Sequence, residues 1–182
     1  GEDIKFEFCL ASRDPDGNLT NGINRVDGRS IPLYQSGGIG NGSDAECIGV
    51  AAVDKEVKSL SKWPVLDYYN IWVVHNICGG WAGYAYYPWG AAEDGAVMLS
   101  KYMTYTNTTL AHELGHGFNL PHTFNGDGGN LTCPENTNCA SQGDFICDTP
   151  PHKQKDCGTS NPCTASGVWN NSRYNYMSYC NP

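Results

Sequence analysis

Long hydrophobic runs are absent from this sequence of 182 residues. A membrane-spanning helix needs about 18 or more consecutive apolar residues, and no stretch reaches that length, so a transmembrane helix is excluded. Basic residues are also few, since 11 Lys and Arg stand against 19 Asp and Glu, which gives a formal net charge of −8. Nucleic acids and anionic membrane surfaces repel such a chain, so we expect neither as a partner.

Internal repeats, low-complexity linkers, a signal peptide and an initiator Met are likewise missing. A chain of this length can bury one proper core, and nothing in the sequence requires a second one, so we expect a single domain over residues 1–182. Because the first residue is Gly1 rather than Met, we expect the chain to be a processed form.

Cysteine, in contrast, is abundant, and nine cysteines in a chain of this size are typical of secreted proteins in an oxidising compartment. Six lie in the last fifty residues, a stretch rich in Gly, Pro, Asn and Thr. They are Cys133, Cys139, Cys147, Cys157, Cys163 and Cys180. Their spacing lacks the close two-residue pairs of zinc ribbons, so disulfides are favoured over a metal knuckle. Because nine is odd, at least one thiol is free or is paired outside this chain.

The segment His112-Glu113-Leu114-Gly115-His116 is the most informative pattern in the chain, and His122 follows it by six residues. On a helix, positions i and i+4 lie on one face about 6 Å apart, so the two imidazoles can share one metal ion. Glu113 is next to the first of them and can reach a water bound to that metal. Composition alone gives roughly 0.005 expected occurrences of the pattern, so a zinc site is favoured over two unrelated surface histidines.

A third ligand has to come from chain that has left the helix. Asn119 tolerates a left-handed conformation, and Pro121 disfavours helical geometry at Leu120. The chain can therefore turn after the helix and bring His122 to the metal. We predict one zinc ion held by the three histidines.

Apolar periodicity places this motif among strands and helices in the first two thirds of the chain, with no periodic segment after Pro121. Strands are expected at 4–10, 69–74, 81–89 and 95–99, the third being an aromatic edge strand. Helices are expected from the capping box Ser43-Asp44-Ala45-Glu46 to about Lys62, and from a cap at Asn107 or Thr108 to about Phe118 or Asn119.

This order of elements and the three-histidine motif resemble the metzincin clan of zinc endopeptidases and, within it, the pappalysin family in its small ulilysin-like form. The similar segments are Asp14-Pro15-Asp16-Gly17-Asn18-Leu19-Thr20-Asn21-Gly22-Ile23, Asn70-Ile71-Trp72-Val73-Val74, the zinc motif with Thr123-Phe124, Gly143-Asp144 with Asp148-Thr149-Pro150, and Asn175-Tyr176-Met177-Ser178-Tyr179. The last of these matches the family's methionine turn, which lies beneath the metal.

The resemblance implies an α+β fold, with an N-terminal twisted mixed sheet, two long helices and an irregular disulfide-rich C-terminal subdomain. Residues 1–120 would form the upper subdomain with the zinc helix, and residues 121–182 the lower one with the third histidine and Met177, with the zinc cleft between them. It also favours the disulfides Cys139–Cys163 and Cys157–Cys180, which leaves Cys133–Cys147 as the local pair. Eight paired cysteines allow 105 connectivities.

The implied function is a secreted zinc endopeptidase that acts on protein or peptide substrates and is made with its own propeptide. Glu113 would take a proton from the zinc-activated water, which attacks a peptide carbonyl, and would then give that proton to the leaving amine. Tyr179 matches a tyrosine that in several metzincins stabilises the tetrahedral intermediate, with a packed aromatic as the alternative. Met177 is expected to be a polarizable packing residue under the histidines.

The resemblance also places the edge strand with Trp81, Ala82, Gly83 and Tyr84 where an extended substrate adds as a further strand. Ordinary strand packing is the alternative for these residues. His75 and His152 fit no ligand spacing and are expected to be structural or surface residues.

Calcium is a further expectation from the resemblance. Asp127, Asp144, Asp148 and Thr149 offer oxygen ligands in loops with little core of their own, although acidic Gly-rich loops are more often solvated turns.

Two departures from the family pattern concern local geometry. The clan usually has Gly where this chain has Asn119, which is the non-Gly residue most tolerant of positive φ, so the turn should form. The chain ends three residues after Tyr179, where relatives usually continue into a further helix. The pocket just past the scissile bond would then have few residues to hold a charged side chain, so we expect tolerant cleavage there.

Two other functions stay open from the sequence alone. One is a zinc-stabilised binding or adhesion module without catalysis, and the other is a metallohydrolase of a non-peptide substrate. Cleavage of casein with and without 1,10-phenanthroline separates the endopeptidase from the binding module, and a non-peptide hydrolase would bind zinc without cleaving peptides.

Overall fold

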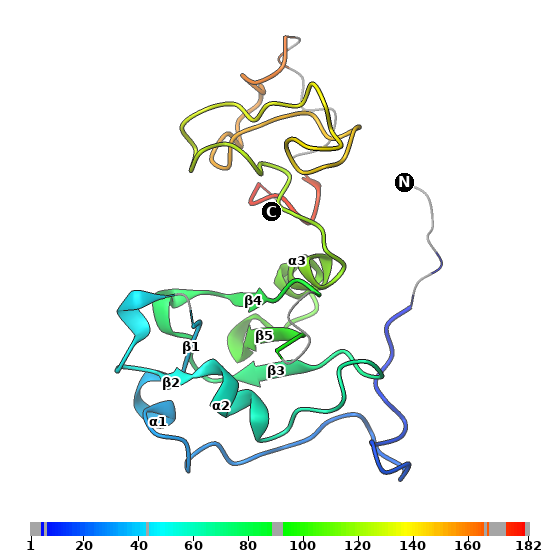
Figure 1. Ribbon diagram of the computed structural model, residues 1–182, viewed down its shortest axis with the longest axis vertical. Coiled ribbons are helices and arrows are strands. Elements are labelled where there is room, and N and C mark those ends of the chain that lie inside the picture. Colours follow the sequence, from blue (N-terminus) through cyan, green and yellow to red (C-terminus); the bar gives the residue numbers. More distant parts are fainter. Residues whose placement is uncertain are drawn as a thin grey trace.

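The computed structural model describes residues 5, 7–42, 44–88, 93–165, 167 and 174–180. Sheet and helices occupy the first two thirds of the chain, and loops crosslinked by disulfides occupy the rest (Figure 1). The expected α+β class is therefore confirmed. None of the helices in the described residues is both long and apolar enough to cross a membrane.

The central sheet has three strands in the order β3 (Ile71–Val74), β5 (Ala96–Leu99) and β4 (Gly83–Ala85). β3 runs parallel to β5, with Trp72 opposite Val97, whereas β4 runs antiparallel to β5. The sheet is therefore mixed, and β4 is an edge strand as expected. This strand is shorter than the range 81–89, of which Trp89 lies outside the described residues.

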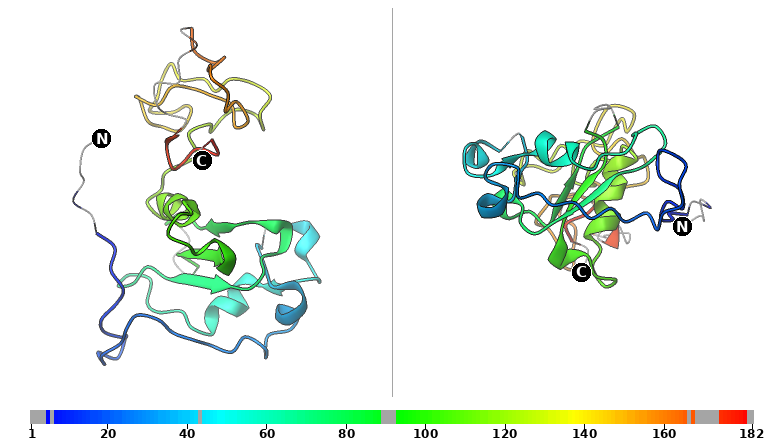
Figure 2. Two further views of the ribbon diagram at one scale, coloured as in Figure 1. Left: turned by 180° about the vertical axis from the view of Figure 1, so that it is seen from behind. Right: turned by 90° about the horizontal axis from the view of Figure 1, so that it is seen from below.

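Two helices lie on opposite sides of this sheet (Figures 1 and 2). α3 (Thr109–Gly117) packs on β4 and β5, and α2 (Asp54–Ser59) lies on the other side. The main core forms beneath α2. Its buried residues are Ile39, Ala52, Val57, Trp72, Val74, Ile77, Tyr84, Val97 and Leu99.

Short elements complete this region. α1 (Tyr34–Gly37) leads into β1 (Ile39–Gly40), which pairs in parallel with β2 (Ala52–Val53). The single-turn 3-10 helices are η1 (Ala45–Cys47), η2 (Cys78–Gly80) and η3 (Ser100–Tyr102).

The long helix expected from 44 to 62 is wrong for most of its length. Its first part is only η1, and its last part is the six-residue α2. Ile48 leaves the helical region with ψ 121°, and Gly49 has φ 77°, so the chain turns there instead of continuing a helix. The Cys47–Cys78 disulfide also holds this turn against η2. Of the expected capping box, Ser43 lies outside the described residues.

The half-buried strand expected at 4–10 is also wrong in its described part. Residues 7–10 belong to no strand, and Phe8 and Leu10 are 51% and 67% exposed. Figure 1 shows this segment running apart from the sheet. The apolar alternation at 4–10 predicted a strand, but the described part of this segment does not pair with the sheet.

The described residues after α3 contain no α-helix or strand, as the absence of periodicity predicts. Three disulfides crosslink this part, namely Cys133–Cys163, Cys139–Cys147 and Cys157–Cys180. The Cys157–Cys180 pair is confirmed, whereas the expected Cys139–Cys163 and Cys133–Cys147 pairs are wrong because these four cysteines exchange partners. Cys9 is the free, exposed thiol that the odd count requires.

Candidate active site

The helix α3 carries the first two histidines of the motif. Its N-terminus is capped by the Asn107 side chain, whose Oδ1 accepts a hydrogen bond from the Thr109 N–H at 2.9 Å. Its last residue is Gly117, slightly before the expected end at Phe118 or Asn119, and Asn119 follows with φ 66° and donates its N–H to the His116 carbonyl. The left-handed turn at Asn119 lets the chain reverse directly after the helix.

The three histidines of the motif converge. One ring nitrogen from each of His112, His116 and His122 lies within 4.8 Å of the others. The Nε2 atom of His122 is 3.1 Å from Nε2 of both other rings. Tetrahedral zinc with Zn–N bonds of 2.0–2.1 Å places its nitrogens about 3.3 Å apart, so this donor set fits zinc.

Backbone carbonyls orient two of the three rings. His112 Nδ1 lies 2.6 Å from the Tyr176 carbonyl, and His116 Nδ1 lies 2.9 Å from the Leu120 carbonyl. A carbonyl can only accept, so each Nδ1 carries the hydrogen and each Nε2 keeps its lone pair for a metal. His122 is held differently, because its ring stacks on Phe124 at 4.7 Å with an interplanar angle of 10°.

Burial keeps the histidine cluster neutral. It lowers the pKa of His112 and of His116, and it lowers the pKa of His122 to about 3 with further help from the neighbouring imidazoles. Only neutral imidazole binds a metal, so the cluster is ready to do so near neutral pH.

Glu113 is 6% exposed and lies beside the histidine cluster on α3. Burial raises the pKa of its carboxyl to about 7, opposed by a backbone hydrogen bond from Ala85. A carboxyl with this pKa can both take up and release a proton near neutral pH, as a general base and acid must.

Two glycines make room for the site. A Cβ on Gly115 would lie 2.2 Å from Met177 Sδ, so the methionine sulfur packs directly on the helix backbone between the two ligands. A Cβ on Gly83 would lie 2.8 Å from Met98 Sδ and 3.2 Å from Glu113 Cγ. The sequence motif contains Gly115, but the spacing of the histidines did not predict the close contact with Met177 that requires glycine there.

Tyr179 and Met177 come from the segment 174–180, which lies between α3 and the disulfide-linked loops in Figure 1 and in the left view of Figure 2. Met177 is 5% exposed. The Tyr179 ring lies 5.6 Å from the His112 ring and 4.8 Å from the His122 ring, and its pKa is raised by burial. The structure therefore brings both residues to the histidine cluster.

The four residues expected to bind substrate differ in orientation. Trp81 is 45% exposed, and its Nε1–H donates to Asp44 Oδ2 at 3.0 Å. Tyr84 is 8% exposed and turned into the core, where its hydroxyl donates to Asp54 Oδ1 at 2.6 Å. The Ala82 carbonyl accepts from Leu99 in β5, so alternation along β4 leaves the backbone of Gly83 on its open edge.

A buried ion pair supports this edge strand and was missed in the sequence. Lys58 and Asp54, which are 2% and 3% exposed, lie 3.1 Å apart on α2. The Lys58 ammonium is 4.2 Å from the centre of the Tyr86 ring and 4.9 Å from that of Trp72. The i,i+4 spacing of Asp54 and Lys58 is the one sequence signal for this ion pair, but the same spacing is typical of exposed ion pairs.

The four expected calcium ligands have unlike surroundings. Both Asp127 oxygens accept backbone N–H groups, from Gly129 and Gln154, each at 2.9 Å. Asp144 Oδ2 is buried and has no hydrogen-bond partner in the described part of the chain. Asp148 is exposed, and Thr149 is buried.

Known proteins similar to this chain include secreted metalloproteases. A family model described as Pregnancy-associated plasma protein-A matches residues 51–182. Extracellular metalloprotease 1 of Coccidioides posadasii is 31% identical over 127 residues, covering 60% of this chain and 41% of the relative. An extracellular metalloprotease of Arthroderma otae is 32% identical over 126 residues, covering 60% of this chain and 42% of the relative. The chain thus spans about two fifths of the length of these relatives.

A solved structure agrees with these relatives. Mature mirolysin of Tannerella forsythia, in complex with a cleaved peptide, aligns with a TM-score of 0.60 and 27% identity, covering 95% of this chain and 62% of that chain. This match confirms the expected metzincin-like fold. Since the family model also covers well over half of the sequence, the chain belongs to the Peptidase_M43 family, the pappalysins.

Proposed function

We propose that this protein is a secreted zinc endopeptidase that hydrolyses peptide bonds in proteins. The observation that carries the proposal is the convergence of three neutral imidazoles within 4.8 Å of one another, with the buried Glu113 on the same helix. Membership of the family and relatives named extracellular metalloproteases support it. The intact carboxyl disfavours the alternative of an inactive zinc-stabilised binding module.

Zinc held by the Nε2 atoms of His112, His116 and His122 would lower the pKa of a bound water and polarise a peptide carbonyl. Glu113 would take a proton from the attacking water and then deliver that proton to the leaving amine. The burial that raises the Glu113 pKa to about 7 suits the carboxyl to both transfers, and the added charge of the metal would lower that pKa again.

Tyr179 is proposed to donate its hydroxyl hydrogen to the oxygen that becomes negative in the transition state. Its ring lies within 5.6 Å of two ligand rings, and it is 47% exposed, so it can reach a substrate. The raised pKa keeps the hydroxyl protonated, as a donor must be.

The substrate is proposed to be an extended peptide that pairs with the open edge of β4. Gly83 presents its backbone on that edge, and Trp81 is an exposed aromatic residue two positions before the strand. Mirolysin, whose structure aligns with this chain, is described as bound to a cleaved peptide. That structure is also called mature, which supports a precursor with a propeptide here.

Calcium is proposed as a structural ion near Asp144. The buried Asp144 Oδ2 and Asn136 Oδ1 both lack a hydrogen-bond partner in the described residues, and Asn136 Nδ2 donates to the Thr149 carbonyl at 2.9 Å. Asp127 is the weaker ligand because backbone groups already occupy its oxygens. Calcium should raise the melting temperature of the wild type and of Asp127→Asn but not of Asp144→Asn, and equal shifts in all three would refute this site.

The proposed function is tested with purified protein, casein and 1,10-phenanthroline. Wild type should cleave casein, lose activity with the chelator and regain it with zinc, whereas His122→Ala should bind less than one equivalent of zinc and cleave nothing. Full zinc content in His122→Ala would contradict the ligand assignment. Bound zinc without cleavage of any peptide by the wild type would favour a binding module.

A further inference from the structure

His152 is completely buried, at 0% exposure, although the described residues after α3 form no α-helix or strand. It is 29 residues from Thr123, to whose side chain it is hydrogen-bonded, and it fits no ligand spacing. A polar side chain buried so deeply must be held by hydrogen bonds or it would destabilise the fold. The contacts of His152 therefore show what it supports.

Both ring nitrogens of His152 have partners. Nδ1 lies 3.1 Å from the Lys153 carbonyl, and Nε2 lies 2.8 Å from Thr123 Oγ1. The carbonyl can only accept, so Nδ1 carries the hydrogen. Burial lowers the pKa of His152, so the ring is neutral and Nε2 accepts the hydrogen of the Thr123 hydroxyl. The Thr123 N–H in turn donates to the Met177 carbonyl at 3.1 Å.

His152 also contacts Phe124, the residue that follows Thr123 in the chain. The two rings lie 6.0 Å apart at 74°, an edge-to-face contact, and the Phe124 ring stacks on His122. His152 therefore holds both residues that follow His122. This matters because carbonyl oxygens orient the other two ligands, whereas packing on Phe124 orients His122.

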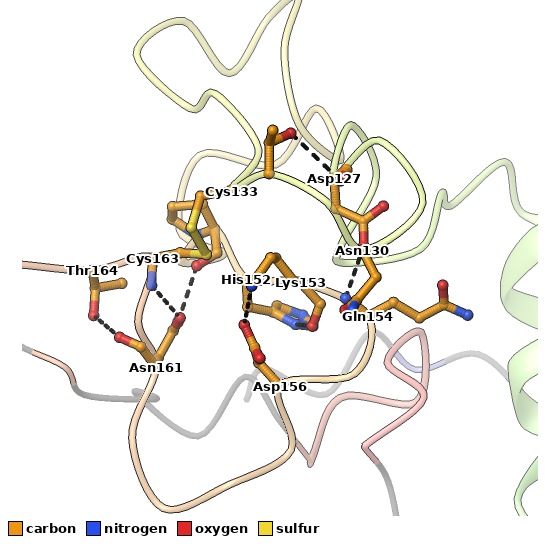
Figure 3. Close-up of a disulfide and its surroundings, with 12 residues drawn as sticks. Asp127, Asn130, Cys133, His152, Lys153, Gln154, Asp156, Asn161, Cys163 and Thr164 are labelled. Atoms are coloured by element: carbon orange, nitrogen blue, oxygen red, sulfur yellow. Dashed lines mark hydrogen bonds and ion pairs between the residues drawn. A yellow bond between two sulfur atoms is a disulfide. The ribbon is translucent and has the colours of Figure 1, made fainter.

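Behind His152, hydrogen bonds continue to a disulfide (Figure 3). The Pro151 carbonyl accepts from Asn161 Nδ2 at 3.0 Å, and Asn161 Oδ1 accepts from the Cys163 N–H at 3.0 Å. Asn161 is itself 0% exposed, and Cys163 is bonded to Cys133. The crosslinked loop thus fixes the position of the segment that carries His152.

We propose that His152 is a positioning residue for the third zinc ligand, which it holds through Thr123 and Phe124 against the loop crosslinked by Cys133–Cys163. The role rests on the proposed zinc site. It makes the disulfide-linked loops part of the metal site rather than only a support for the fold. The imidazole of His122 would then be held in place before zinc binds, which slows the release of the metal.

The test is the rate at which the zinc-loaded protein releases its metal to a chromogenic chelator. Partners that orient a metal ligand typically contribute about 10- to 100-fold in metal affinity, so His152→Leu and Thr123→Val should each release zinc faster by about that factor. The double variant should release zinc no faster than His152→Leu, because Thr123→Val breaks only the hydrogen bond that His152→Leu has already removed. His152→Gln can still accept the Thr123 hydroxyl and should recover part of the loss.

His75→Leu is the matched control, since His75 is an exposed histidine whose ring contacts the Tyr34 ring at 5.0 Å. It should release zinc at the wild-type rate. Cobalt in place of zinc gives a second reading, because a displaced His122 should change the visible absorption of the His152→Leu protein.

The proposal is overturned if folded His152→Leu and Thr123→Val release zinc within about twofold of the wild type, well below the effect of a ligand-orienting partner. A lower melting temperature with unchanged zinc release would mean that His152 only stabilises the fold. If His152→Leu does not fold, Thr123→Val, which keeps the shape of the side chain, decides the question. A wild type that binds no zinc would instead refute the proposed function.

Discussion

Replacing Gly115 with Ala tests the contact between the zinc helix and Met177. The added Cβ would lie 2.2 Å from Met177 Sδ and 3.2 Å from Met177 Cε, whereas unstrained heavy atoms stay about 3.5–4.0 Å apart. Met177 is 5% exposed, so its side chain has little room to move away. The Met177 side chain, the helix or the segment that carries Met177 must therefore shift, and burial limits how far the side chain alone can move.

Two effects of opposite sign compete in this variant. Gly→Ala inside a helix usually stabilises by about 1 kcal/mol, and overpacking of a core destabilises by about 1–3 kcal/mol. We expect overpacking to win, so Gly115→Ala should lower the free energy of unfolding by up to about 2 kcal/mol. It should also speed the release of zinc, because α3 carries two of the proposed ligands.

Urea unfolding of Gly115→Ala, Met177→Ala and the double variant, with zinc removed, measures the effect. The double variant removes the overlap and keeps the helix preference, so it should be more stable than the sum of the single changes predicts by about 1–3 kcal/mol. If Gly115→Ala stabilises the protein and the two changes are additive, then Met177 does not pack against the helix as the structure shows.

Three further predictions concern other parts of the molecule. Asp54→Asn should lower the free energy of unfolding by about 3–5 kcal/mol because it leaves the buried Lys58 charge unpaired, whereas Asp54→Asn combined with Lys58→Met should cost less. In metal-free protein, His122 binds more protons in the unfolded state than in the native state between about pH 3 and 6.5, so it lowers the free energy of unfolding as pH falls. Glu113 has the opposite effect, because its pKa in the native state is raised to about 7. Urea unfolding of Glu113→Gln should therefore show a steeper loss of stability on acidification than the wild type. Peptide mapping without reduction should find Cys9 free and the pairs Cys47–Cys78, Cys133–Cys163, Cys139–Cys147 and Cys157–Cys180.

The zinc helix was predictable because its signals are local. The Asn107 cap, the i,i+4 histidines and the turn at Asn119 lie within one segment of the chain, and all three appear in the structure. The strands β3 and β5 were also near their expected ranges, since both are short apolar runs bounded by other residue types.

The rest depended on contacts between residues far apart in the sequence. The expected helix at 44–62 is interrupted at Ile48 and Gly49, beside a disulfide from Cys47 to a cysteine 31 residues away. No local pattern shows such a pair, and for the same reason two of the three expected pairings in the C-terminal part were wrong. The role of His152 was hidden in the same way, because its partner Thr123 is remote in sequence.

The central claim is that Glu113 activates water at a zinc ion bound by the three histidines, and Glu113→Gln tests it most directly. The amide has nearly the shape of the carboxyl but cannot accept the proton, so zinc content and melting temperature should stay close to the wild type. Casein and peptide cleavage should fall at least about 10²-fold, the scale for loss of a general base. Wild-type kcat in a Glu113→Gln protein with one bound zinc would contradict the claim.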